Sequence, residues 1–166
     1  MVTSEYRRIM VAIDGSKTAE LAFKKAVNIV KRNKGTLIIT HIVDTRSVTL
    51  FPQYNQTVSN SQLYESSKSA ATKTVDLYRD WATENGLEDV ETVLRNGSPR
   101  TELSDVLPEE LNVDLLILGA TGLSAIERAF VGSVSQHVIR NAPCDVLVVR
   151  TNSDDIDDAP IVNREE

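Results

Sequence analysis

Strand-like and helix-like segments alternate along the whole of this 166-residue chain. Short apolar runs rich in β-branched residues, which suit buried strands, occupy residues 8–13, 36–43, 115–118 and 144–149. A shorter strand with polar residues, at 90–94, suits a sheet edge. In the segments between them, apolar residues recur every three or four positions, which is the pattern of one helix face. This alternation predicts an α/β fold, a single domain in which helices cover both faces of a parallel sheet.

Residues that favour helix ends separate these segments. We expect four helices, which begin after Ser16, at about Ser61, at Pro99 and at Ser133. Gly35 and Gly86 suit the ends of the first two, because glycine tolerates the left-handed backbone that often closes a helix. Pro108 should end or kink the third helix, because proline lacks the N–H that a helix interior requires. Ser133 and Gln136 fit a capping box at the start of the fourth.

The net charge of −6 is concentrated near the C-terminus. Residues 151–166 carry six acids and one base, which accounts for five of the six net negative charges. We therefore expect a folded domain over residues 1–150 and an acidic, mobile tail over residues 151–166. The nearly neutral domain lacks the basic patch that is typical of nucleic-acid binding.

Several features of the sequence bear on where the protein works. No apolar run approaches the roughly 20 residues of a membrane span, and the N-terminus lacks the apolar segment and cleavage site of a signal peptide. The single cysteine, Cys144, cannot form an intrachain disulfide, which suits a reducing compartment. The histidines and this cysteine are too far apart in sequence to suggest a metal cluster. These features predict a cytoplasmic protein with neither a membrane nor a nucleic-acid partner.

A glycine-rich turn follows the fourth strand and leads into the fourth helix. It consists of Leu118-Gly119-Ala120-Thr121-Gly122, nine further residues, and Gly132-Ser133-Val134-Ser135. Open α/β sheets bind ligands at the carboxyl ends of their strands, and free N–H groups at a helix N-terminus bind anions. Glycine lets the backbone approach a ligand, and the hydroxyls of Ser133 and Ser135 add donors for phosphate oxygens. The turn predicts a phosphate or nucleotide site, against the alternative that its glycines serve only the turn.

The turn and its flanks resemble the universal stress protein family. The spacing G-x2-G-x9-G-[ST], from Gly119 to Ser133, matches the ATP-binding signature of that family, and VAIDGS, HIVD, DLLILG and PCDVLVV are similar over about residues 5–150. The resemblance implies a Rossmann-like, three-layer α/β/α fold of the adenine nucleotide α-hydrolase-like type, with a five-stranded parallel sheet in the order 3-2-1-4-5. It also implies a homodimer that binds ATP, ADP or AMP, with Mg²⁺ on the phosphates, and acts in stress response or signalling.

The resemblance also implies roles for individual residues. Ala12 and Ile13 would line the base pocket, the backbone of Ile42 would meet the adenine, and Gly119 would lie near the ribose. Asp14 would contact the adenosine or a phosphate-bound metal, although a residue in this position could simply cap the next helix. The phosphates would be surrounded by Gly122, Gly132, Ser133, Val134 and Ser135. The complete expected site is Ala12, Ile13, Asp14, Ile42, Leu118, Gly119, Thr121, Gly122, Gly132, Ser133, Val134 and Ser135.

Other parts of the chain leave alternatives open. The last strand, Cys144–Val149, would form an apolar sheet edge that needs cover, and pairing with the same strand of a second copy gives a two-fold dimer. Residues 44–60 are expected to form a loop, and a lid over the nucleotide is one use for it. No nucleophile with an adjacent base is visible, so no catalytic residue is expected. A weak ATPase and a dimeric interaction module without nucleotide remain as alternatives to an ATP-binding signalling protein.

Overall fold

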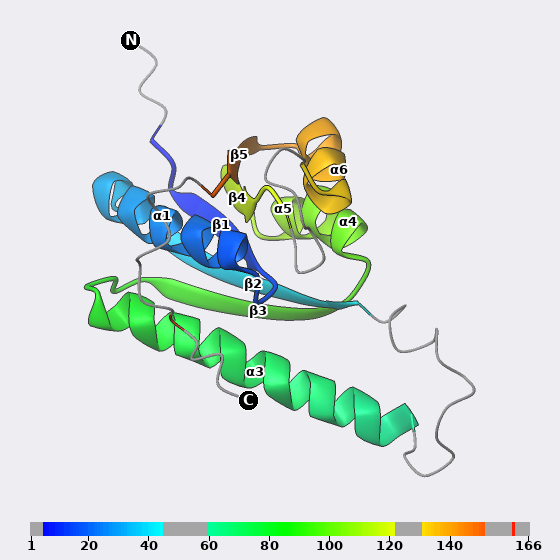
Figure 1. The fold of residues 1–166 in the computed structure, drawn as a ribbon. Helices are drawn as coiled ribbons and strands as arrows, with labels where there is room; N and C mark the ends of the chain where they lie inside the picture. Colours follow the sequence, from blue (N-terminus) through cyan, green and yellow to red (C-terminus); the bar gives the residue numbers. More distant parts are fainter. Residues whose placement is uncertain (1–4, 45–59, 122–130, 152–160, 162–166) are drawn as a thin grey trace.

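The computed structural model describes residues 5–44, 60–121, 131–151 and 161. Its elements are β1 (Arg8–Ile13), α1 (Lys17–Asn33), β2 (Thr36–Asp44), α3 (Asn60–Glu84), β3 (Val90–Gly97), α4 (Pro99–Thr101), the π-helical turn η1 (Glu102–Val106), α5 (Leu107–Glu110), β4 (Leu115–Gly119), α6 (Ser133–Asn141) and β5 (Asp145–Val149) (Figure 1). Most of the loop expected over residues 44–60 lies outside the described residues.

The five strands are parallel and lie in the order β3-β2-β1-β4-β5. β1 is central, with Ala12 beside Thr40 of β2 and Val11 beside Ile117 of β4. Parallel pairing brings the carboxyl ends of β1, β2 and β4 to one end of the sheet. The predicted α/β fold and the sheet order 3-2-1-4-5 are confirmed.

Helices cover both faces of the sheet, so the domain has three layers (Figure 1). Successive side chains of β1 point to opposite faces, because a strand has a period of two. Ile9 and Val11 belong to the core under α1 and α3, whereas Met10 packs with Leu107 of α5 and Val138 of α6. All five side chains are 0% exposed. Each face of the sheet therefore has its own fully buried core.

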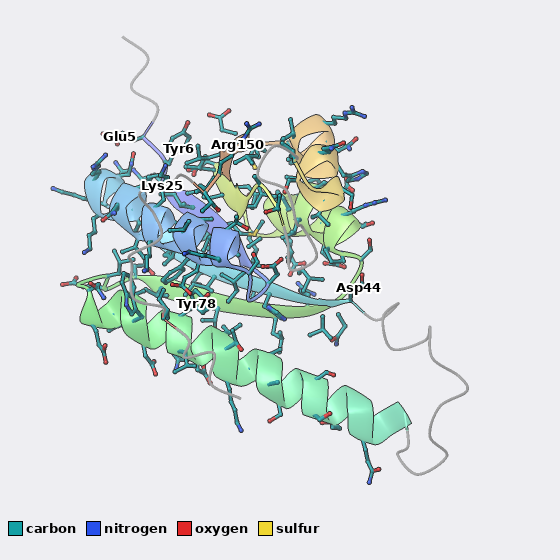
Figure 2. The ribbon with its side chains drawn as sticks, in the orientation of Figure 1. Glu5, Tyr6, Lys25, Asp44, Tyr78 and Arg150 are labelled. Carbon is teal, nitrogen blue, oxygen red and sulfur yellow. The ribbon has the colours of Figure 1, made fainter. Side chains whose placement is uncertain are left out.

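Three aromatic rings fill the core under α1 and α3. Phe23 of α1 meets Tyr78 of α3 edge to face, with ring centroids 4.7 Å apart and planes at 87°. Trp81 contacts the same Phe23 ring at 5.6 Å. Figure 2 shows Tyr78 on the side of α3 that faces the sheet. These contacts hold the long helix α3 against α1 and the sheet.

The third predicted helix is irregular, and Pro108 does not end it. Helical residues continue to Glu110, so of the two predicted outcomes at Pro108, an end or a kink, the end is wrong. The disturbance takes the form of the π turn η1, in which the Leu107 N–H bonds the carbonyl of Glu102, five residues earlier. Because Pro108 has no N–H for the carbonyl of Ser104, the regular α pattern cannot continue through it, and the helix widens just before the proline.

Of the acidic tail, the structure describes Thr151 and Ile161. The side chain of Ile161 packs against the core under α1 and α3, and its N–H donates to Glu20 Oε1 at 3.2 Å. Glu20 is 8% exposed, and Lys24 Nζ lies 3.5 Å from the same carboxylate oxygen. Ile161 of the tail therefore contacts the domain.

Candidate functional site

A cavity of about 260 Å³ opens at the carboxyl ends of β1, β2 and β4. It is lined by Ala12, Ile13, Asp14, Ala19, Thr40, Ile42, Pro99, Leu103, Leu118, Gly119, Thr121, Gly132, Ser133, Val134 and Ser135. Eleven of the twelve residues predicted for the site thus border one cavity, and the twelfth, Gly122, lies outside the described residues. Ala19, Thr40, Pro99 and Leu103 also line the cavity, and the sequence analysis missed them.

The N-terminus of α6 points its free N–H groups toward this cavity. Gly132 is the N-cap residue, and the first helical hydrogen bond runs from the Gln136 N–H to the Gly132 carbonyl at 2.9 Å. The N–H groups of Ser133, Val134 and Ser135 therefore have no acceptor within the helix. Together with the helix dipole, these groups form an anion-binding end of the cavity.

The predicted capping box at this helix is wrong. Ser133 lies inside the first turn with an exposed side chain, because the helix is capped one residue earlier, by Gly132. The Gln136 side chain instead donates to the carbonyl of Val131 at 2.6 Å. Leaving the Ser133 hydroxyl out of a cap keeps it at the rim of the cavity.

Ser135 has a different role from the one predicted for its hydroxyl. The side chain is 5% exposed, and Oγ donates to the carbonyl of Gly119 at 2.8 Å. A hydroxyl has one proton, so this bond removes the donor that the sequence analysis assigned to phosphate. The bond instead fastens α6 to the end of β4, and the backbone N–H of Ser135 remains at the cavity.

The N-terminus of α1 forms a second side of the cavity. Ser16 caps this helix by accepting from the Ala19 N–H at 3.1 Å. Asp14 Oδ1 accepts from the Ser16 N–H at 2.9 Å, so Asp14 shapes the turn before the helix but does not cap it. The Asp14 side chain is exposed at the rim. The alternative that Asp14 only caps the helix is wrong, and its carboxylate stays within reach of a ligand.

Gly119 joins β4 to α1 by close contact. A Cβ at this position would lie 2.7 Å from Thr18 Oγ1, 2.8 Å from the Thr18 carbonyl carbon and 2.9 Å from the Ala19 nitrogen. The Thr18 hydroxyl also donates to the carbonyl of Thr121. Only glycine allows β4 and the first turn of α1 to approach this closely, and their approach shapes the cavity wall.

The end of the cavity that lies on the sheet is apolar. Ala12, Ile42 and Leu118 extend from the strand ends and pack with Leu103 of η1 in the core on this face. Thr40 lies among them, 0% exposed, and its Oγ1 has no hydrogen-bond partner among the described residues. A planar apolar group would be covered by these side chains, and the Thr40 hydroxyl could hydrogen-bond a polar atom of such a group.

His41 lies next to Thr40 on β2 but faces the other way. Its Nδ1 lies 2.9 Å from the Ile13 carbonyl, which can only accept, so Nδ1 carries the proton. Burial lowers the pKa of His41, partly offset by that hydrogen bond and by the charge of Asp14. The ring therefore holds the end of β1 as a neutral donor rather than facing the cavity.

The cavity suits an elongated ligand with one planar and one anionic end. Its apolar end is closed by strand residues, and its polar end meets the N-termini of α1 and α6. Within the described residues no group of three or more His, Cys, Asp or Glu side chains could hold a metal ion by itself. Within the same residues no helix has both the length and the apolar character needed to cross a bilayer.

Residues 5–150 match the model of a family described as the universal stress protein family. The chain belongs to this family. The match covers the same residues as the resemblance in the sequence, which is thereby confirmed. The sheet order agrees with the fold of solved members of this family.

Sequence relatives and solved structures agree with this assignment. A universal stress protein of Staphylococcus aureus is 44% identical over 146 residues, which cover 88% of this chain and 85% of that protein. The structure of the universal stress protein UspA from Lactobacillus plantarum superposes with a TM-score of 0.76 at 28% identity, over 89% of this chain and 99% of that one. A universal stress protein in complex with cAMP superposes with a TM-score of 0.63, also at 28% identity, over 90% and 100%.

Proposed function

We propose that this universal stress protein binds ATP, or the related ADP or AMP, in the cavity and acts in the cytoplasm as a homodimer in stress response or signalling. The observation that carries the proposal is the polarity of the cavity. One end is apolar and lies on the sheet, and the other meets free N–H groups of α6. Its volume of about 260 Å³ is near the lower end for small-molecule pockets, roughly 300 Å³, and suits a nucleoside with phosphates extending outward.

The polarity also orients the nucleotide. Its adenine would lie against Ala12, Ile13 and Leu118 and meet the backbone of Ile42, while the ribose would lie near Gly119. The phosphates would then reach the N–H groups at the start of α6, with Thr121 and Gly122 on the same side. This assignment uses the residues Ala12, Ile13, Asp14, Ile42, Leu118, Gly119, Thr121, Gly122, Gly132, Ser133, Val134 and Ser135.

A magnesium ion would accompany a di- or triphosphate. Mg²⁺ keeps several waters and commonly needs only one or two protein carboxylates in addition to phosphate oxygens. Asp14 supplies such a carboxylate, since it is exposed at the rim of the cavity. The ion would therefore be held mainly by the nucleotide, and its affinity should depend on the nucleotide being bound.

The relative that was solved with cAMP supports an adenine nucleotide as the ligand. Its 28% identity and its coverage of 90% of this chain make the same cavity the natural place for a ligand of this class. Isothermal titration of the protein with cAMP, ATP, ADP and AMP would therefore show which adenine nucleotide the cavity prefers.

The binding proposal is tested by thermal unfolding with and without ATP, and by a substitution that places a negative charge at the start of α6. ATP at about 100 times its Kd should raise the Tm by about 5–10 °C. Ser133→Asp should stabilise the free protein slightly, because a negative charge is favourable at the start of a helix. The same charge should repel the phosphates and weaken ATP binding by about tenfold or more. Ser133→Ala, the neutral variant, removes one hydroxyl donor and should weaken ATP binding less than Ser133→Asp does. A wild-type Tm that ATP does not move would reject the proposal.

The homodimer would form through the last strand. β5 (Asp145–Val149) is an edge of the sheet, and an unpaired edge can add a strand from a second copy. Antiparallel pairing of two β5 strands, over the predicted segment Cys144–Val149, gives a closed two-fold dimer. Size-exclusion chromatography with light scattering should give twice the chain mass of 18.3 kDa. A mass of one chain at micromolar concentration would count against the dimer without affecting the nucleotide proposal.

A further inference from the structure

Thr40 is a polar residue in an apolar part of the cavity. Its side chain is 0% exposed, and Oγ1 has no hydrogen-bond partner among the described residues. Its neighbours in the sheet are Ala12 of β1 and Val93 of β3, and neither side chain can bond a hydroxyl. A buried hydroxyl without a partner lowers stability, so a purely structural position would favour valine, which has nearly the same shape.

Thr36 on the same strand provides a direct contrast. It lies four residues earlier and therefore on the same face of β2, and it too is buried, at 9% exposed. Its hydroxyl donates to Asp89 Oδ2 at 2.6 Å. One threonine of β2 is thus fully satisfied at the amino end, whereas the other is unsatisfied where the strand borders the cavity.

We propose that the Thr40 hydroxyl hydrogen-bonds the edge of the bound adenine and thereby helps to select the base. The inference rests on the proposed nucleotide function, and it adds a residue to that site. The apolar side chains of Ala12, Ile42 and Leu118 would cover a base without distinguishing one base from another. A hydroxyl can donate to a ring nitrogen or accept from an amino group. A base that cannot bond the buried hydroxyl would leave it unpaired. This single hydrogen bond would therefore favour adenine over other bases.

The proposal predicts two effects of opposite direction for Thr40→Val. The free variant should be as stable as the wild type or more so, with a Tm up to about 2 °C higher, because an unpaired hydroxyl is replaced by a methyl group. Its Kd for ATP, measured by isothermal titration calorimetry, should rise about three- to tenfold, because the hydrogen bond to the base is lost. A residue with only a structural role does not produce this combination.

Two further variants serve as controls. Thr36→Val makes the same chemical change on the same strand face but removes a hydrogen bond that exists, so it should lower the Tm and leave the Kd for ATP unchanged. Thr40→Ser keeps the hydroxyl and loses only the methyl group, so it should bind ATP within about twofold of the wild type.

Adenine analogues identify the atom that Thr40 contacts. The probes are the triphosphates of 1-deaza-, 3-deaza- and 7-deazaadenosine and of purine riboside, each of which lacks one polar group of the adenine. One of them should bind the wild type about three- to tenfold more weakly than ATP and should lose nothing further in Thr40→Val, because both changes remove the same bond. Equal ATP affinity in Thr40→Val and wild type overturns the inference and leaves the nucleotide proposal intact. A wild type that binds no ATP overturns both.

Discussion

At the amino ends of the strands, polar groups satisfy one another. Asp114 accepts hydrogen bonds from the backbone N–H groups of Arg7 at 2.7 Å and Arg8 at 3.1 Å. The Arg8 guanidinium forms two hydrogen bonds with the Glu91 carboxylate, at 3.1 and 3.0 Å, and the Arg8 Nε–H donates to the carbonyl of Leu111 at 2.6 Å. This end of the sheet is closed by its own side chains.

The carboxyl ends of the same strands are arranged in the opposite way. The N–H groups of Ser133 and Val134 have no acceptor within α6, and Thr40 Oγ1 has none among the described residues. The buried Thr40 hydroxyl costs stability while it is unpaired. The comparison teaches that polar groups at the amino ends stabilise the fold, whereas at the carboxyl ends Thr40 Oγ1 and the first N–H groups of α6 lack a partner among the described residues, as the proposed nucleotide site requires.

The largest effect on stability should come from removing a hydrogen-bond acceptor at the amino ends of the strands. Asp114→Ala removes the acceptor of two backbone N–H groups and should lower the free energy of unfolding by about 2 kcal/mol, measured by urea denaturation. ATP affinity of the folded variant should stay within about twofold of the wild type, because Asp114 is at the opposite end of the strands from the cavity. Asp114→Asn keeps one carbonyl acceptor and should lose roughly half as much. A large loss of ATP affinity in Asp114→Ala would break the comparison.

Two glycines with equally close neighbours, Gly35 and Gly119, allow a matched test of the two ends. A Cβ on Gly35 would lie 2.7 Å from the Arg7 carbonyl oxygen, and a Cβ on Gly119 would lie 2.7 Å from Thr18 Oγ1. Both Gly35→Ala and Gly119→Ala should therefore lower stability, by about 1–2 kcal/mol, because backbone atoms must move apart. Only Gly119→Ala should also weaken ATP binding, by about tenfold, because it displaces the first turn of α1 from the cavity wall. Equal affinities in the two variants would show that this wall does not hold the nucleotide.

The sequence predicted those features that depend on local patterns. The bounds of β1 (Arg8–Ile13) and the start of α6 at Ser133 are those expected, because apolar periodicity and the flanking turn residues specify them. The glycine spacing and its flanks likewise anticipated eleven residues that border one cavity. Their roles toward a nucleotide remain predictions, as do the tail and the dimer.

The features that the sequence could not predict depend on contacts between distant segments. Whether Ser135 donates to phosphate or to Gly119 depends on how closely α6 approaches β4. From the sequence, Thr40 is an ordinary β-branched strand residue. Its hydroxyl lacks a partner in the sheet because its neighbours on the adjacent strands are Ala12 and Val93. The sequence did contain a signal that Thr40 borders the site. Thr40 is two residues before the predicted site residue Ile42, so both side chains lie on the same strand face. The π turn before Pro108 likewise reflects packing that no local propensity encodes.

The smallest predicted effect concerns His41, which lies at the open end but faces away from the cavity. Burial lowers its pKa below the ordinary value of about 6.5. The unfolded chain therefore binds a proton that the folded protein does not, in the pH range between the lowered pKa and about 6.5. The stability contributed by neutral His41 is fully present above pH 6.5 and is lost as the pH falls through this range. We expect a loss of at most about 1 kcal/mol between pH 7.5 and 5.5, measured by urea denaturation.

His41→Asn isolates this contribution, because an amide N–H can replace Nδ1–H toward the Ile13 carbonyl and does not titrate. The variant should unfold with a weaker dependence on pH than the wild type, and its ATP affinity at pH 7.5 should be unchanged. Thr40 and His41 are adjacent, yet only the hydroxyl of Thr40 is expected to affect binding, because only that side chain borders the cavity without a partner of its own. If His41→Asn weakened ATP binding as much as Thr40→Val, the idea that only the cavity-side face of β2 contributes to binding would be wrong.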